Sequence, residues 1–199
     1  MLRSSRRPRI ARQRSQARPG EAAALRELDR ARAPLFREMA ALVADAAYQR
    51  ELQGTPPHRC CQRQLNQMRI SPLEARAIAL AFERDPQLRA KLDQVRQRLE
   101  KVLPRLRRST ARQNFDCPLL EGTRCLVHHS AKPIGCAAWN PRREFSEDAW
   151  EAFARRDELN DQIYGPRWKL HVIPLWLERV LPAEVPERAG PPTGDRGYP

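Results

Sequence analysis

Five cysteines are the most reactive side chains of this sequence, and they fall into two groups. Two are adjacent, and the other three lie within one stretch of twenty residues; the five are Cys60, Cys61, Cys117, Cys125 and Cys136. None lies in a periodic apolar stripe, and the later three share a turn-rich stretch with two prolines and two glycines. Inert buried cysteines behave as small apolar residues. The pattern therefore favours metal ligands.

Five cysteines can supply enough thiolates for two kinds of metal centre. Four of them satisfy the tetrahedral preference of zinc, and a cubane cluster also requires four. Neighbouring side chains in an extended chain diverge, so we expect one of Cys60 and Cys61 to bind together with the three later cysteines. His58 and His128 are near enough in sequence to replace a thiolate, and His129 is a poorer candidate. The prediction is one site that holds a zinc ion or an iron–sulfur cluster.

The N-terminus and the composition bear on the compartment. Residues 1–20 carry seven arginines and no acid, about half of the net charge of +13. No apolar stretch of 7–15 residues follows, so the segment is not a secretory signal. The longest apolar stretches, such as 77–82 and 172–177, are far shorter than the roughly 20 residues of a membrane-spanning helix. We expect a cytoplasmic protein with no membrane contact, in which an odd number of cysteines stays reduced.

Helical periodicity indicates the elements that carry these cysteines. Apolar residues recur at three- and four-residue steps from 21 to about 52, where Pro34 predicts two helices or one kinked helix. Ser71 begins a second helix through 83 with a capping-box pattern. A third runs over 86–103 as one amphipathic stripe that Pro104 should end or bend. A hairpin of the last two helices brings the two cysteine groups together at one end.

The remaining segments complete the expected organisation. Residues 111–145 lack helical periodicity, Ser146 begins another helix that ends near Gly165, and a last apolar element covers 172–181. The fold class is mainly α, a small helical domain with an irregular cysteine-rich metal-binding loop. The expected divisions are a disordered basic tail, one helical domain and a disordered tail rich in proline and glycine, over residues 1–20, 21–181 and 182–199.

The later cysteine segment resembles a known family. Cys117-Pro118-Leu119-Leu120, Cys125-Leu126-Val127-His128 and Lys132-Pro133-Ile134-Gly135-Cys136 are similar to the YkgJ-type cysteine cluster family, also called the CxxCxxCC or zinc- or iron-chelating domain. Cys60-Cys61 and Ser71-Pro72-Leu73-Glu74 stand where that family has its first cluster and a short helix, so that the resemblance covers residues 54–140. It implies metal chelation by the five cysteines.

The sequence also departs from the family pattern. Gly54 and Pro57 occupy the first two cysteine positions, and Lys132 replaces the usual arginine before Pro133. Five cysteines therefore support one metal site rather than two.

The sequence is compatible with three functions. The first is a metal-binding protein without catalysis of its own, which acts through a protein partner. The second is a cluster-dependent enzyme that modifies a protein side chain, since the flagellin lysine methylases are similar in carrying a comparable cysteine cluster; no S-adenosylmethionine motif is recognised here. The third is a nucleic-acid-binding module with a structural zinc. It would use the basic tail and a face formed by Arg105, Arg107, Arg108 and Arg112. Aromatic residues for base stacking are scarce, so this function is not favoured.

Overall fold

The computed structural model describes residues 18–51, 59–108, 113–140 and 144–182. The expected tails at 1–17 and 183–199, the turn at 54–57, His58 and Arg112 lie outside the described residues. Within the described ranges the chain forms eight α-helices, one 3-10 turn and four two-residue strands. In chain order they are α1 (Glu21–Ala44), α2 (Ala46–Glu51), η1 (Arg59–Cys61), β1 (Arg69–Ile70), α3 (Pro72–Arg84), α4 (Pro86–Ala90), α5 (Leu92–Arg108), β2 (Leu120–Glu121), β3 (Arg124–Cys125), α6 (Ile134–Ala138), α7 (Glu147–Tyr164), β4 (His171–Val172) and α8 (Ile173–Val180). The predicted mainly α class is confirmed.

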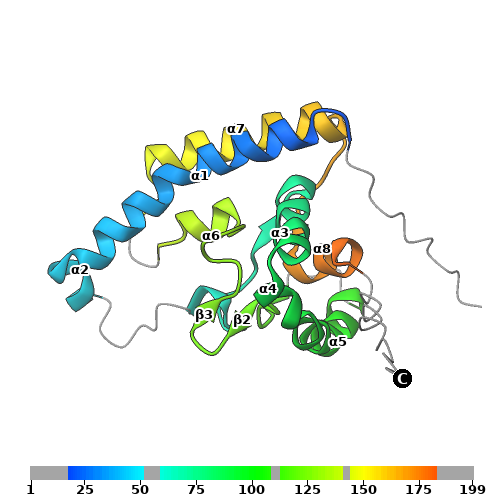
Figure 1. The fold of residues 1–199 in the computed structure, drawn as a ribbon. Coiled ribbons are helices and arrows are strands. Elements are labelled where there is room, and N and C mark those ends of the chain that lie inside the picture. The colour runs from blue at the N-terminus through cyan, green and yellow to red at the C-terminus, as the bar shows by residue number, and fades with distance from the viewer. Residues whose placement is uncertain (1–17, 52–58, 109–112, 141–143, 183–199) are drawn as a thin grey trace, which may run out of the picture.

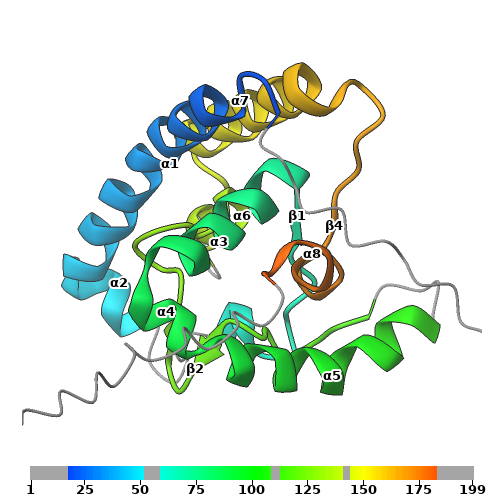
Figure 2. The same cartoon turned by 45° about the vertical axis from the view of Figure 1, so that its right-hand side comes forward.

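Helices α1 and α7 form one layer of the molecule. They lie side by side and antiparallel (Figures 1 and 2). The hydroxyl of Ser146 accepts a hydrogen bond from the N–H of Ala149, so the predicted helix start at this serine is confirmed. Pro34 lies inside α1, which continues as a single helix past it. The layer is held by an apolar core that contains Ala24, Leu28, Leu35, Ala149, Ala152 and Leu159.

Helix α3 joins this layer to the rest of the molecule. The side chain of Ser71 accepts a hydrogen bond from the N–H of Glu74, whose carboxylate accepts one from the N–H of Ser71. The predicted capping box is therefore present. Leu73 belongs to the core beneath α1 and α7, whereas Ile78 and Phe82 belong to a second core shared with α4, α5 and α8.

The amphipathic stripe at 86–103 differs from the prediction in two ways. It is divided at Lys91 into α4 and α5, and α5 continues past Pro104 to Arg108. A proline within a helix costs one hydrogen bond. Here Leu99 and Leu103 on the same helix are buried in the second core, and this burial offsets that cost. The expectation that Pro104 ends the helix is wrong.

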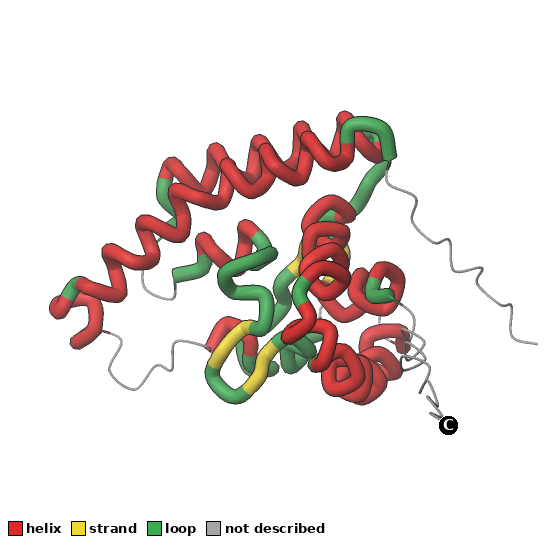
Figure 3. Tube along the Cα trace, viewed as in Figure 1, coloured by secondary structure: helices red, strands yellow, loops and turns green. Residues whose placement is uncertain are grey.

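The segment between α5 and α7 is largely irregular in its described part (Figure 3). It contains the antiparallel pair β2–β3, which places Leu120 opposite Cys125. The turn between these strands needs a left-handed residue, which Gly122 provides at φ 57°. The short helix α6 follows. A second antiparallel pair, β1–β4, joins the start of α3 to the start of α8.

No helix within the described residues combines the length and the apolar character that crossing a bilayer requires.

Candidate functional site

Backbone hydrogen bonds bring the two cysteine groups together. The N–H of Cys117 donates to the carbonyl oxygen of Cys61 at 2.8 Å, and the N–H of Phe115 donates to that of Asn66 at 3.1 Å. Residues 61–66 and 115–117 therefore run side by side, although the three helices α3, α4 and α5 separate them in sequence. The predicted meeting of the two groups is confirmed.

The adjacent thiols of Cys60 and Cys61 lie on the same side of the chain. Their Sγ atoms are 3.8 Å apart. The divergence expected for extended chain is not observed, because these residues end the 3-10 turn η1. Successive residues in such a turn are rotated by about 120° rather than pointing to opposite faces. Both thiols are consequently available to one centre.

Hydrogen bonds between thiols, or burial, raise the pKa of four of the cysteines. The pKa of Cys60 is raised first by its hydrogen bond with Cys61, and that of Cys61 is raised to about 12, chiefly by its hydrogen bond with Cys117. Burial is the main cause for Cys125, and burial followed by the charges of neighbouring thiols raises the pKa of Cys136 well above its usual range. The five cysteines, here called the thiol cluster, are free of disulfides and come from two segments that backbone hydrogen bonds hold side by side.

A lysine lies next to the thiol cluster. Lys132 is 9% exposed, and its Nζ lies 3.3 Å from Nδ1 of His128 and 3.9 Å from Sδ of Met39. Its charge acts on the thiols of Cys60 and Cys125, and on that of Cys136. Among the described residues, no carboxylate lies within ion-pair distance of this ammonium group.

The imidazole of His128 lies between this lysine and helix α1. It borders a cavity of about 380 Å³ that is lined by Phe36, Met39, Ala40, Val43, His128 and His129. Burial, followed by the charges of Lys132 and His129, lowers the pKa of His128 to about 4. The ring is therefore neutral at pH 7, and its Nδ1 can accept a hydrogen bond from the ammonium group.

This pKa predicts an acid-sensitive contribution to stability. In the unfolded chain His128 takes up a proton near pH 6.5, whereas in the folded chain it does so only near pH 4. Unfolding therefore takes up protons in this window, and His128 makes stability fall as pH drops from about 6.5 towards 4. We expect His128→Gln to flatten this fall in urea unfolding of the metal-free chain, and His129→Gln to reduce it only slightly, because the charge of His129 is the smallest of the three causes that lower the pKa of His128. Parallel pH curves for wild type and His128→Gln would contradict the assignment.

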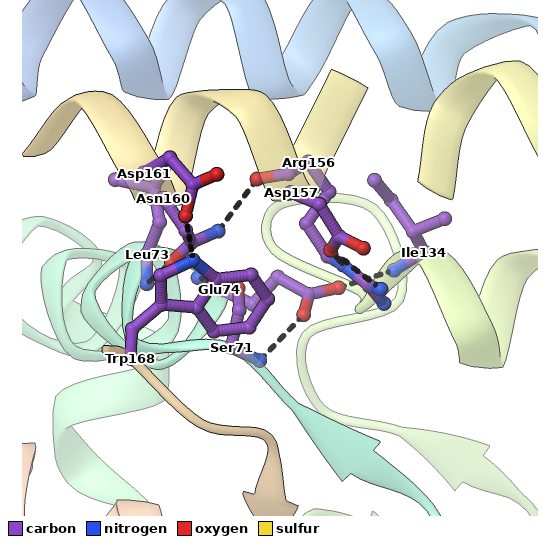
Figure 4. A network of polar contacts seen from close by, with 9 residues as sticks. All are labelled: Ser71, Leu73, Glu74, Ile134, Arg156, Asp157, Asn160, Asp161 and Trp168. Carbon is purple, nitrogen blue, oxygen red and sulfur yellow. Dashed lines mark hydrogen bonds and ion pairs between the residues drawn. The ribbon is translucent and has the colours of Figure 1, made fainter. Parts of the chain in front are cut away.

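A buried carboxylate positions helix α6 (Figure 4). Glu74 is 1% exposed, and its Oε2 accepts from the N–H of Ser71 at 2.8 Å. Its Oε1 accepts from the N–H of Ile134, also at 2.8 Å. Ile134 is the first residue of α6, whose preceding residue, Pro133, supplies no side-chain cap. Glu74 thus caps two helices at once, and the second of them carries Cys136.

A buried amide holds the same end of α3 against α7 (Figure 4). Oδ1 of Asn160 accepts from the N–H of Leu73 at 3.1 Å, and Nδ2 donates to the carbonyl oxygen of Arg156 at 2.7 Å. Trp168 Nε1 donates to Asp161 on the same helix at 2.7 Å. Asn160 therefore anchors the start of α3, whose Glu74 caps α6, to helix α7.

Two residues of this arrangement were not identified as functional from the sequence. Glu74 was expected only to cap its own helix, and Lys132 was noted only as a replacement for arginine. The alternation of apolar and charged residues gave no sign that either side chain would be buried. His58, the other histidine considered as a ligand, lies outside the described residues.

The thiols are close together without forming a finished coordination site. Across the described residues, no three Cys, His, Asp or Glu side chains are arranged so that they could hold a metal ion as they stand. Coordination would therefore require side-chain rotations within the thiol cluster.

The chain matches no family model, no curated protein and no solved structure. The case for a function therefore rests on the residues of the site.

Proposed function

We propose that this chain is a metal-binding protein, in which the thiol cluster holds one metal centre and performs no catalysis of its own. The observation that carries the proposal is that backbone hydrogen bonds hold two distant cysteine-bearing segments side by side, with the Sγ atoms of Cys60 and Cys61 3.8 Å apart and all five cysteines free. The grouping of the cysteines in the sequence predicts such an arrangement. Cys117 also belongs to the second core, and Cys61, Cys125 and Cys136 pack against it, so a bound metal would lie at the edge of this core.

The donor set fits zinc first. A tetrahedral zinc ion with Zn–S bonds of about 2.3 Å separates its sulfur ligands by about 3.8 Å. The Sγ atoms of Cys60 and Cys61 lie 3.8 Å apart, a separation that supports a single ion to which both could bind. Five thiols exceed the four that one ion needs, so one remains as a supporting or exchangeable thiol. An iron–sulfur cluster on four of these cysteines is the alternative centre.

Bound metal would serve here as a cross-link. A structural zinc ion holds thiolates together, and binding releases the protons that the free thiols carry. The residues that would hold it come from η1, from the segment before β2, from β3 and from α6. Each of these pieces has at most a few backbone hydrogen bonds of its own, so a shared ion would fix their relative positions.

The proposal places the protein in a reducing compartment, the cytoplasm. Thiols as close as those of Cys60 and Cys61, and joined by three more, remain reduced where glutathione and thioredoxin act. Their free state in this structure supports that placement.

Metal analysis together with an absorbance spectrum tests the proposal. The protein is purified without oxygen as wild type, as Cys125→Ser and as His129→Gln, the last serving as a control beside the site. We expect about one zinc per chain and a colourless solution in the wild type and the control, with the metal lost from Cys125→Ser. Iron with sulfide and a broad absorption in the violet would establish a cluster and favour the enzymatic alternative. Absence of metal from all three proteins would overturn the proposal.

A further inference from the structure

We infer that the cavity between helices α1 and α3 is a binding site for a small organic anion with an apolar body. Such a ligand carries one carboxylate, sulfonate or phosphate group on an aliphatic or aromatic skeleton. The site is separate from the thiol cluster, because no cysteine is among the described residues that line the cavity. The inference therefore adds a second function and does not depend on the proposed metal centre.

The cavity has the size of a small-molecule site. Its volume is about 530 Å³, which lies within the range of about 300–1,000 Å³ that is usual for ligand pockets. Its lining residues on α1 fall between Glu21 and Arg32, and those on α3 fall between Arg76 and Arg84. Each set occupies one face of its helix, because its members recur with the helical period. The cavity is thus formed where these two faces meet.

Small and partly buried apolar side chains form the hollow. Ala22 from α1 and two alanines from α3, Ala77 and Ala81, line the cavity. Leu25 and Leu80 complete the apolar wall and are only partly buried. They therefore keep apolar surface that a ligand can cover, and removal of such surface from water favours association.

The three carboxylates that line the cavity are engaged within the protein. Oε1 of Glu21 accepts a hydrogen bond from Nε of Arg76 at 3.0 Å, and Asp29 is paired with Arg32. The side chain of Asp85 accepts hydrogen bonds from backbone N–H groups at the start of α4. Two of the four arginines of the cavity therefore already have a carboxylate partner.

The other two arginines of the cavity have no such partner. Arg26 lies on α1 and Arg84 on α3, and both side chains line the cavity at exposed positions. Among the described residues, no carboxylate lies within ion-pair distance of either. A guanidinium group can bind the oxygens of an anion through two parallel hydrogen bonds. An anionic group held by these arginines would place its apolar body against the wall that contains Leu25 and Leu80.

Binding of an anionic fluorescent probe tests the inference. The probe is anilinonaphthalene sulfonate, which carries one sulfonate on an apolar aromatic body, and phenylnaphthylamine is its neutral counterpart. One double variant combines Arg26→Gln with Arg84→Gln. The control combines Arg37→Gln with Arg105→Gln, which removes two exposed arginines outside the cavity. Leu80→Asn alters the apolar wall, and urea unfolding checks that each variant is folded.

The expected results separate the charge from the apolar wall. The wild type should bind about one anionic probe per chain with saturation. Loss of Arg26 and Arg84 should weaken this binding by about tenfold or more, as expected for lost hydrogen bonds to charged groups, and should leave binding of the neutral probe unchanged. The control should keep both affinities. Leu80→Asn should weaken the binding of both probes.

Several results would overturn the inference. One is an equal affinity of the wild type and the Arg26 and Arg84 double variant for the anionic probe. Another is a loss of the same size in the control, because charge anywhere on the surface would then suffice. Binding of many probes without saturation would indicate exposed apolar surface rather than a site. If Leu80→Asn does not fold, Leu25→Asn takes its place with the same criteria.

Failure of this site can be told from failure of the metal site. Cys125→Ser should bind the anionic probe as tightly as the wild type, because the cavity contains no thiol among its described residues. Loss of probe binding in Cys125→Ser would overturn the separation of the two sites.

Discussion

Stripping metal from the purified protein is expected to lower its thermal midpoint by about 10 °C. A ligand present at a thousand times its Kd stabilises the folded state by about 4 kcal/mol. In a chain of this size, each kcal/mol corresponds to roughly 2–4 °C. The expectation rests on the proposed metal site. The measurement is a thermal unfolding scan in circular dichroism, under reducing conditions, with and without an excess of a strong chelator.

The loss of stability that follows removal of the metal should also be local. The helices α1 and α7 pack against each other over a core to which α3 and α6 also contribute, whereas the thiols come from η1, from the segment before β2, from β3 and from α6. Hydrogen exchange should therefore accelerate on chelation around 113–138 and remain slow in the centres of α1 and α7. Cys125→Ser provides the matched control, since its midpoint should already be low and should respond little to chelator. A wild-type midpoint that ignores the chelator would contradict the prediction.

The helical frame could be predicted well from the sequence, because it depends on local signals. Ser71 and Ser146 begin helices where a serine can cap the following N–H groups. Of the two outcomes predicted for Pro104, an end or a bend of the helix, the end is not observed, because Pro104 lies inside α5. Proline is a local signal against a helix, and burial of the neighbouring Leu103 outweighs it. Such burial depends on α8, far along the chain, and cannot be read from the helix itself.

The candidate site could be predicted only in part. Grouping of the cysteines in the sequence, together with the two helical segments between them, predicted that they would meet. The directions in which the thiols of Cys60 and Cys61 point could not be predicted from the sequence. They depend on whether these residues lie in extended chain or, as observed, in a 3-10 turn. The burial of Lys132 was equally inaccessible, because lysine is almost always exposed and its surroundings come from α1 and the 126–131 loop.

Replacing Glu74 by alanine is expected to destabilise the protein by about 3–5 kcal/mol. The change leaves the N–H groups of Ser71 and Ile134 without their acceptor. An unsatisfied buried polar group costs about 1–3 kcal/mol. Burial lowers the pKa of Arg32, and the charge of Glu74 opposes that shift, so removing the carboxylate also removes this favourable effect on a buried cation. Urea unfolding of the metal-free chain, followed by circular dichroism, gives the change in the free energy of unfolding.

Two further variants separate the carboxylate from general effects of substitution. Glu74→Gln keeps one acceptor oxygen but presents an NH₂ group where the second was, so we expect an intermediate loss. Glu83→Gln, on the same helix, alters a partly exposed side chain that pairs with Arg76, and surface pairs of this kind contribute at most about 1 kcal/mol. A loss below about 1 kcal/mol in Glu74→Ala would mean that other groups or water satisfy the two N–H donors. A large loss would establish that the helix start predicted from Ser71 and Glu74 also holds α6, and with it Cys136, in place for the thiol cluster.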